Sequence, residues 1–598
     1  MAKTQETFIK QASAPTPHGL AGLINGWTGT WFLLTAASMG VYCALTTHLL
    51  EGPEYWWWVL WLGPPLVVFP LFYGAMLLYF HDKRQTAEPV QRVFPVLYWG
   101  RKLITEVGPL FRQYLFASDR EETPYNRITR NWVYQTSRGR RNTIGFGSQV
   151  DMDQVGSVIV LPKTFTNKAA HTGEEIGHSY RKVIGQRPGV EAVVLNHFIH
   201  ISAMSFGALS ANAHMALNKG AKKAGILHNC GEGGMAPCHE QGGDLVFQIG
   251  TGKFGVRDDN GNMDEGALRQ LAQHPQVKLF EVKLAQGAKP GKGGMLLKEK
   301  ITAEIARIRK VPMGKDVHSP PRHKEFNDVN GLFDFIDRVR GIVKKPVGIK
   351  MVIGHTEEIE SIAKKMRDEP GRGPDYIAID GGEGGTGAAP LVLASHAGLP
   401  MKQALAVAHW ALKEYGVRDK VVLFAGGKIA TPVDIAVAMA LGADACYCAR
   451  GFMLALGCIQ ALECHTNTCP TGIATQDPKL AAALDVDSAA ERVATYAKEL
   501  YHETQTLAEA CGYDSPDQLL PDDIMVVTKP GHLDYLSELQ GVSAFEASVE
   551  RRKAAALQMS VGEMKIKRAK GAGTSSEIAV PQLSPSDSAP PAAKPGGS

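Results

Sequence analysis

The sequence predicts an α/β protein built on a (β/α)8 TIM barrel, with an N-terminal transmembrane helical hairpin and a small pre-domain. Eight short, β-branched apolar runs alternate with loops and helix-like stretches between residues 197 and 449, which is the pattern of such a barrel. Two long apolar runs precede this region, and a charged, mixed segment separates them from it. A doubly wound sheet is the alternative to the barrel.

The composition excludes several classes of protein. The 64 Lys and Arg residues nearly balance the 60 Asp and Glu residues, and no basic stripe with interleaved aromatic residues is present, so we expect no nucleic-acid partner. Nine cysteines among 598 residues are too few for a disulfide scaffold and indicate a reducing compartment. A chain of this length has room for one large domain and smaller parts.

Two apolar runs near the N-terminus are long enough to cross a membrane. Residues 31–50 and 55–80 contain no Asp, Glu, Lys or Arg, and a span needs about 20 apolar residues. The tryptophans at 56–58 suit an interfacial belt, and the stretch HDKR (81–84) places basic charge after the second run. The positive-inside rule then predicts an inner (cytoplasmic) membrane protein with two spans and its catalytic domain on the cytoplasmic side. Two buried core helices are the alternative.

The rest of the chain divides by composition. A basic stretch at 125–142 either lies near anionic headgroups or is a solvated face. The last residues are rich in Pro, Ser, Ala and Gly without aromatics, which is typical of disorder. The predicted parts are a cytoplasmic segment (1–26), two transmembrane helices (27–82), a cytosolic pre-domain (83–190), the barrel (191–530), a C-terminal helical region (531–570) and a disordered tail (571–598).

The eight predicted strands are short apolar runs, most of them followed by a loop of Gly, Pro or polar residues. They cover 197–202, 226–229, 245–250, 279–285, 347–353, 376–381, 421–427 and 443–449. Helix-like stretches follow, most clearly at 390–416 and 431–442. Because the chemistry of such barrels gathers where the strands end, the residues directly after these runs are the candidates for a site.

Glycine-rich loops follow several of the strands. Glycine lets backbone N–H groups close on a phosphate or a flat ring. Gly384 and Gly385 follow the sixth run, while Gly426 and Gly427 end the seventh. Arg450 follows the eighth and suits a bidentate contact with phosphate oxygens. Together these loops predict a nucleotide-like cofactor across the mouth of the barrel.

Three cysteines lie within twelve residues: Cys458, Cys464 and Cys469. The spacing C-x5-C-x4-C is neither a zinc knuckle nor a thioredoxin-type pair. Iron–sulfur clusters usually take four thiolates, and structural zinc takes four nitrogen or sulfur ligands. His465 could complete a zinc site, but it adjoins Cys464 and would struggle to point at the same ion. From the spacing alone, an iron–sulfur cluster, a zinc ion and buried structural thiols all remain open.

Six motifs over about residues 195–480 together resemble the FMN-binding synthase domain of glutamate synthase. They are SAMSFGALS (202–210), GEGG (231–234), KLAQGAKPGKGG (283–294), SPP (319–321), GGEGGTGAAP (381–390) and CHTNTCPTGIATQD (464–477). The resemblance implies a (β/α)8 barrel with FMN and a 3Fe–4S cluster held by the three cysteines. It also implies reduction of 2-iminoglutarate, formed from 2-oxoglutarate and ammonia, to glutamate.

The resemblance assigns roles by matching positions. Lys283 corresponds to a lysine near the flavin pyrimidine edge, and Gln286 to a contact of flavin and substrate. Glu232 is the candidate for handling the imine proton. The cofactor-binding set is Ser202, Ala203, Met204, Gln248, Lys283, Gly384, Gly385, Gly426, Gly427 and Arg450. Candidate cationic anchors for a dicarboxylate are Arg322, His323 and Lys253.

The chain departs from the family in ways that affect its substrates. The first cysteine is Cys43, inside a predicted span, so we expect no glutaminase and a nitrogen supply from free ammonia or an amine. No G-x-G-x-x-G follows a strand, so electrons should come from a separate donor protein, ferredoxin or an NADPH-oxidising subunit. Lys292 and Lys428 replace residues usual in the family, which leaves the substrate open. The alternatives are a flavin dehydrogenase of another substrate coupled to a membrane electron carrier, or a non-catalytic electron-relay subunit.

Overall fold

The computed structural model describes residues 71–86, 89–140, 143–148, 150–165 and 180–539. The chain forms two compact units, Met1–Thr123 and Pro124–Ser598. The division falls inside the predicted pre-domain, so that the residues after Thr123 belong to the same unit as the barrel.

The described part of the first unit is helical. Residues 71–84 form a helix. It is followed by α5 (Pro89–Val93), α6 (Leu97–Phe111) and the π-helical turn η2 (Arg112–Phe116). The buried carboxylate of Asp82 accepts hydrogen bonds from Gln91 Nε2 at 2.6 Å and from the backbone N–H of Val96 at 2.9 Å. These bonds tie the end of the first helix to the start of α6.

The predicted two-span inner-membrane localisation is corrected by the structure. Among the described residues, no helix is both long and apolar enough to cross a membrane. The predicted span 31–50 and residues 55–70 of the second lie outside the described residues. Residues 71–80, the described part of that second run, lead straight into the charged positions 82–84.

The second unit contains a closed barrel of parallel strands in the order β10-β11-β12-β13-β4-β5-β6-β7. The strands are β4 (Ile199–Ile201), β5 (His228–Asn229), β6 (Leu245–Ile249), β7 (Val277–Lys283), β10 (Val347–Met351), β11 (Tyr376–Asp380), β12 (Val422–Gly426) and β13 (Ala445–Cys448). Each strand falls within or overlaps one of the eight predicted runs. The predicted barrel is therefore confirmed, and closure of the sheet rules out the doubly wound alternative.

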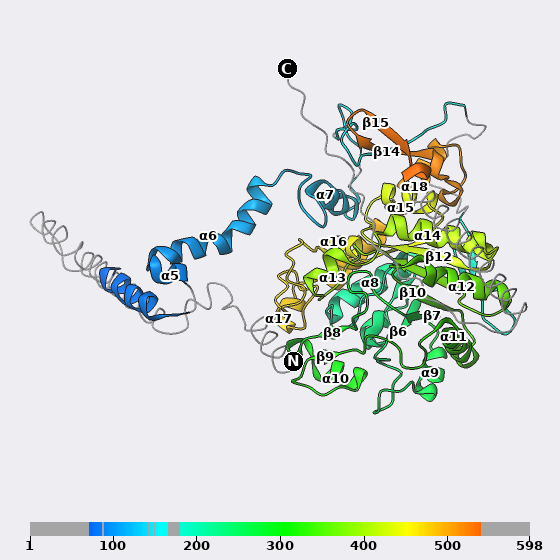
Figure 1. Ribbon diagram of the computed structural model, residues 1–598, viewed down its shortest axis with the longest axis horizontal. Coiled ribbons are helices and arrows are strands. Elements are labelled where there is room, and N and C mark those ends of the chain that lie inside the picture. Colours follow the sequence, from blue (N-terminus) through cyan, green and yellow to red (C-terminus); the bar gives the residue numbers. More distant parts are fainter. Residues whose placement is uncertain (1–70, 87–88, 141–142, 149, 166–179, 540–598) are drawn as a thin grey trace, which may run out of the picture. The chain divides into compact units, whose positions relative to one another are not determined.

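Helices surround these strands (Figure 1). They are α8 (Ala211–Ala224), α9 (Glu265–Ala272), α10 (Ala303–Arg309), α11 (Val329–Val343), α12 (Thr356–Asp368), α13 (Leu391–His396), α14 (Met401–Glu414), α15 (Pro432–Ala440), α16 (Arg450–Leu456), α17 (Pro478–Ala481) and α18 (Val486–Ala510). Side-chain oxygens of Ser210, Asp328 and Thr431 cap α8, α11 and α15. The predicted stretch 390–416 is split into α13 and α14, because Gly398 has φ 82° and Pro400 follows it.

Two groups of elements lie outside the regular alternation. Between β7 and α11 the chain forms β8 (Met295–Leu296), the 3-10 turn η5 (Lys298–Lys300), α10 and β9 (Val317–His318). At the other end of the chain, β14 (Ile524–Lys529) pairs with β15 (His532–Tyr535) and with β1 (Val158–Val160).

Part of the predicted pre-domain therefore belongs to the barrel unit. Besides β1 it supplies α7 (Arg127–Thr136) and the strand β2 (Lys182–Ile184), which pairs with β3 (Val193–Leu195). The predicted C-terminal helical region begins instead with β15 and the short helix α19 (Leu536–Leu539). The remainder of that region and the predicted tail lie outside the described residues.

Candidate active site

A cavity of about 510 Å³ lies at the carboxyl ends of the barrel strands. Residues at or just after all eight strands line it, together with loops from η5 and from the segment after α16. Small-molecule sites of barrels occupy this position and this range of volume. The cavity is therefore the candidate active site.

The structure brings nearly all of the predicted site residues to this cavity. Those on its wall are Ser202, Ala203, Met204, Glu232, Gln248, Lys283, Gln286, Gly384, Gly385, Gly427, Arg450, Cys458, Cys464 and Cys469. Gly426 is the last residue of β12, directly before the wall residue Gly427, and does not line the cavity itself. The role assigned to each residue stays a prediction.

The three predicted substrate anchors do not line the cavity. Lys253 is buried and pairs with Glu325 at 3.0 Å. His323 stacks on Phe326, and its Nε2 lies 3.0 Å from the Lys283 carbonyl oxygen. The Lys253 ammonium and the Nε2 of His323 are thus already engaged with protein groups.

The polar centre of the cavity is a group of three predicted residues. Lys283, at the end of β7, donates from Nζ to Glu232 Oε1 at 2.9 Å and to Gln286 Oε1 at 3.2 Å. Gln286 Nε2 donates to the Gly385 carbonyl at 2.9 Å, which joins this group to the loop after β11. One lysine thus orients a carboxylate and an amide toward the same space.

Glycines leave room for the Glu232 carboxylate. Glu232 lies in the 3-10 turn η3 (Gly231–Gly233), directly after β5. A Cβ added to Gly250 would come within 2.7 Å of Glu232 Oε2, and one added to Gly294 within 2.6 Å of Oε1. A contact this short would force the end of the Glu232 side chain to move, so the two glycines leave the carboxylate the space that it occupies here.

Three cations surround Glu232. Burial would raise its pKa, but Lys283, Lys289 and Arg309 outweigh burial and lower the pKa below its usual value. Glu232 is therefore ionised at neutral pH. Burial lowers the pKa of Lys289 to about 8, while Glu232 opposes that shift. Lys289 Nζ donates to the Ala388 carbonyl at 3.0 Å, and Arg309 Nη2 donates to the Phe206 carbonyl at 2.6 Å.

The sequence analysis missed both Lys289 and Arg309. Lys289 had a signal, since it stands three residues after Gln286 in a motif already singled out. Arg309 had none, because it ends α10, a helix outside the regular strand–helix alternation.

A second buried pair was also missed. Lys350 in β10 and Asp380 at the end of β11 both line the cavity, with Nζ and Oδ2 3.3 Å apart. Burial lowers the pKa of Lys350, but Asp380 and Glu281 raise it more, so the lysine stays charged. Gln248 lies in β6 and donates from Nε2 to Glu281 Oε1, on the neighbouring strand β7, at 2.6 Å. This bond uses one of the two amide hydrogens, so the second N–H and the carbonyl oxygen of Gln248 are left for a ligand.

Exposed backbone and one guanidinium mark another part of the wall. A Cβ at Gly385 would meet Arg450 Nε at 3.0 Å, and Gly427 has φ 140°, which side chains rarely adopt. Arg450 Nη2 donates to the Glu383 carbonyl at 2.6 Å, and its guanidinium lies 5.1 Å from the Tyr125 ring. Close backbone and a half-buried arginine fit a phosphate group, as FMN carries.

The cysteine loop borders the same cavity, and none of its thiols is in a disulfide. Lys300, at the end of η5, donates from Nζ to three carbonyls, those of Cys464 at 2.6 Å, Ala474 at 2.8 Å and Ala208 at 3.2 Å. Tyr134 on α7 donates to the Cys458 carbonyl at 2.6 Å. The backbone of the loop is thereby held at both ends.

The three thiols are more widely spaced than the ligands of one zinc ion. Within the described part of the chain, the group of three side chains whose ligand atoms lie within 4.8 Å of one another is a histidine trio, not these cysteines. Thiolates on one zinc at about 2.3 Å stand about 3.8 Å apart. A multi-iron cluster takes each thiolate on a different iron and so accepts wider spacing. The loop fits such a cluster.

Comparisons with known proteins agree with this geometry. A family model described as "Conserved region in glutamate synthase" matches residues 165–514. This chain belongs to the glutamate synthase family. The glutamate synthase large subunit-like protein YerD of Bacillus subtilis is 37% identical over 508 residues, which are 79% of this chain and 96% of that protein.

Other relatives match a shorter part of this chain. The archaeal glutamate synthase (NADPH) of Methanocaldococcus jannaschii is 37% identical over 324 residues, 54% of this chain, and this chain covers 60% of its length. Named members of the family are oxidoreductases acting on CH–NH2 donors, so the predicted enzyme class is confirmed. A flavocytochrome b2 with pyruvate bound is 13% identical with a TM-score of 0.37, over 72% of this chain and 85% of that one. A likeness this distant carries no argument about the site.

Proposed function

We propose that this chain is an FMN- and 3Fe–4S-dependent oxidoreductase that aminates 2-oxoglutarate reductively, via 2-iminoglutarate, to glutamate. The nitrogen comes from free ammonia or an amine, and the electrons come from a separate donor such as a ferredoxin or an NADPH-oxidising subunit. One observation carries the proposal above the others: the cavity holds Glu232 among Lys283, Lys289 and Arg309, within a member of the glutamate synthase family.

The charge of this group suits a dicarboxylate. Three cations and one carboxylate give a net charge of +2 (3 − 1), which matches the two carboxylates of 2-oxoglutarate. Lys289 and Arg309 supply the charge for the carboxylates, since each keeps N–H groups beyond the one bonded to a backbone carbonyl. Lys283 would turn the keto end of the substrate toward Glu232.

Glu232 is the residue that would hold the proton of the incoming amine. It is ionised, its Oε1 is already a hydrogen-bond acceptor, and glycines leave both carboxylate oxygens accessible. A carboxylate in this state accepts a proton as ammonia adds to a carbonyl and returns it when water leaves.

The residues that line the cavity suggest where each cofactor would bind. FMN would be held by the loops of Gly384, Gly385 and Gly427 with Arg450 at its phosphate, and the iron–sulfur cluster by the cysteine loop. When bound, FMN supplies hydride chemistry and the cluster supplies single-electron chemistry.

Anaerobic reoxidation of the flavin tests the proposal. The purified protein is first assayed for flavin and iron, then reduced chemically, and the flavin absorbance is followed after adding 2-oxoglutarate with ammonium, then with methylamine. We expect reoxidation only when keto acid and amine are both present. Reoxidation by a quinone analogue alone, or by keto acid without amine, would contradict the proposal, as would a colourless protein.

A further inference from the structure

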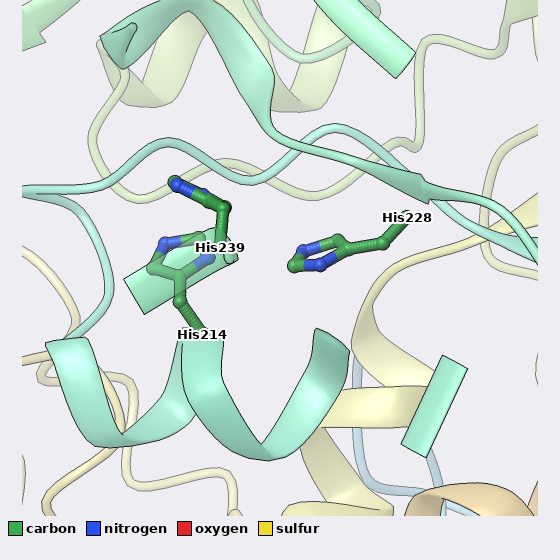
Figure 2. A group of neighbouring side chains, drawn as sticks. All are labelled: His214, His228 and His239. Atoms are coloured by element: carbon green, nitrogen blue, oxygen red, sulfur yellow. The ribbon is translucent and has the colours of Figure 1, made fainter. Parts of the chain in front are cut away.

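Three histidines outside the cavity lie together in the interior (Figure 2). His214 is on α8, His228 begins β5, and His239 ends the 3-10 turn η4 (Pro237–His239). One ring nitrogen of each lies within 4.8 Å of the other two, and all three side chains are fully buried. The sequence does not hint at this cluster, because the three residues come from three separate elements.

Most of their ring nitrogens make no hydrogen bond of ordinary geometry. Among the described residues this holds for both nitrogens of His214 and for Nε2 of His228 and His239. Burial lowers the pKa of His214 to about 4, an effect that the nearby Ser205 carbonyl only partly offsets. The rings are therefore neutral at pH 7, the form that binds metals. Buried polar atoms without partners call for a water or an ion between them.

We propose that His214, His228 and His239 bind a divalent transition-metal ion of the zinc type. Imidazole suits such ions. No carboxylate belongs to the trio, so the calcium and magnesium class is disfavoured. Nitrogens on one tetrahedral zinc at about 2.0–2.1 Å stand about 3.3 Å apart, so the rings need to close in by at most about 1.5 Å from the 4.8 Å limit.

The second nitrogen of the His239 ring is compatible with metal binding. A ligating histidine usually donates its other N–H to a carbonyl or carboxylate. The Nδ1 of His239 lies 3.2 Å from the Ala236 oxygen and 3.0 Å from its amide nitrogen, so either tautomer finds a partner. The Nδ1 of His228 lies 3.4 Å from the Asn218 amide nitrogen, which is a donor. Metal binding through Nε2 of His228 therefore requires this weak contact to break, so that Nδ1 can carry the ring proton.

The position of the trio indicates what the metal would do. His228 stands directly before, and His239 directly after, the loop 229–238 that carries Glu232. Within this loop a Cβ at Gly231 would come within 2.7 Å of the Met204 backbone, so the loop packs closely there. A metal that joins both ends of the loop to α8 would hold Glu232 at the cavity. Only this last step rests on the proposed function; metal binding does not.

Metal analysis of tag-free protein tests the proposal. Zinc and iron are measured separately by mass spectrometry in wild type, in His228→Gln and His239→Gln, and in two controls. His200→Gln removes a buried histidine outside the trio. A variant with Cys458, Cys464 and Cys469 changed to Ser removes the thiols proposed to bind the iron–sulfur cluster. We expect about one zinc per chain in wild type and both controls, and about a tenth of that in the two trio variants.

Two results would overturn the metal site: wild type that takes up no zinc, or zinc that disappears only with the cysteines. If the trio variants fail to fold, cobalt-substituted wild type still decides. Cobalt bound by histidine nitrogens gives visible absorption bands without thiolate-to-cobalt charge transfer, which is the expected result. Charge-transfer absorption, or the absence of cobalt bands, would contradict metal binding by the three histidines.

Hydrogen exchange tests separately whether the metal holds the loop 229–238 in place. A chelator should speed amide exchange within 228–239 in wild type, and unchanged exchange would refute the role in holding the loop. Neither measurement depends on catalytic turnover. If glutamate synthesis is not observed, the metal site can still be confirmed, and if no metal binds, the proposed function is not affected.

Discussion

At the scale of single residues, Lys289 sets the pH dependence expected of the cavity. Its pKa is lowered to about 8, so the ammonium loses its proton as the pH rises through that value while Glu232 stays ionised. Because only the charged form attracts a carboxylate, we expect the affinity for 2-oxoglutarate to fall about tenfold between pH 7 and pH 9. Calorimetric titration across this range measures it. Lys289→Met should bind more weakly at pH 7 and lose this dependence, and a variant that keeps it would refute the assignment.

Glu232 offers a second test at the same scale. Glu232→Gln keeps the shape of the side chain but removes the charge that holds a proton, so kcat should fall by about 10² to 10⁴. Flavin and iron content should not change, since neither cofactor is held by this carboxylate. Glu240→Gln, an exposed position in the next turn, is the matched control. Near wild-type turnover of Glu232→Gln in single-turnover kinetics would exclude it as the proton-handling group.

At the scale of an element, the cysteine loop depends on one buried lysine in η5. Lys300→Met removes three hydrogen bonds to carbonyls of the loop and its neighbours, each worth about 1.5–3 kcal/mol when the donor is charged. We expect the variant to lose iron several-fold faster to a chelator. Lys298→Met, in the same turn but exposed, should behave as wild type. Equal rates of iron loss in the two variants would show that the loop does not need Lys300.

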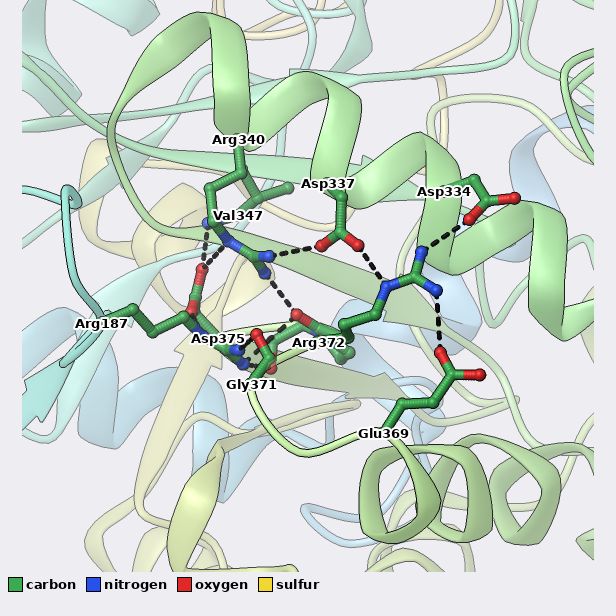
Figure 3. A network of polar contacts seen from close by, with 11 residues as sticks. Arg187, Asp334, Asp337, Arg340, Val347, Glu369, Gly371, Arg372 and Asp375 are labelled. Atoms are coloured by element: carbon green, nitrogen blue, oxygen red, sulfur yellow. Dashed lines mark hydrogen bonds and ion pairs between the residues drawn. The ribbon is translucent and has the colours of Figure 1, made fainter.

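The network at the amino ends of β10 and β11 tests the stability of the barrel (Figure 3). Asp375 accepts from Arg187 Nε at 2.5 Å, from Arg340 Nε at 3.1 Å and from the N–H of Val347 at 2.8 Å. Asp375→Ala would leave two largely buried guanidinium groups without this carboxylate.

A loss of about 3–5 kcal/mol in the free energy of unfolding is expected for Asp375→Ala. The exposed Asp334, which pairs with Arg372 in the same network, should cost at most about 1 kcal/mol when changed to Ala. Denaturant unfolding measures both changes. Equal losses would mean that burial does not set the energetics of this network.

At the scale of the whole molecule, the two compact units predict a separable catalytic part. The barrel, α7 and the β1–β14–β15 sheet all lie within Pro124–Ser598. A chain that begins at Pro124 should therefore fold and bind flavin and iron in the same ratio as the full chain. Absorbance and metal analysis measure this. An insoluble product, or one without flavin, would show that the first unit is needed for the barrel to form.

The sequence by itself determined the barrel, because strand and helix periods and the glycines between them are local properties. All eight strands lie where the apolar runs predicted them, and strand ends such as Lys283 and Gly427 reach the cavity because parallel strands end on one face. Local signals were wrong at the N-terminus, where apolar length, aromatic flanks and basic residues predicted a membrane localisation that the described helices do not support.

Only the tertiary structure decided which charges meet in the cavity. Arg309 and Lys300 arrive from the excursion between β7 and α11, and neither stands at a strand end where the pattern would find it. The histidine trio joins α8, β5 and η4 in the same way. Such residues become neighbours through packing between segments that are distant in the sequence. The periodicity of the sequence does not predict which loop packs over which strand.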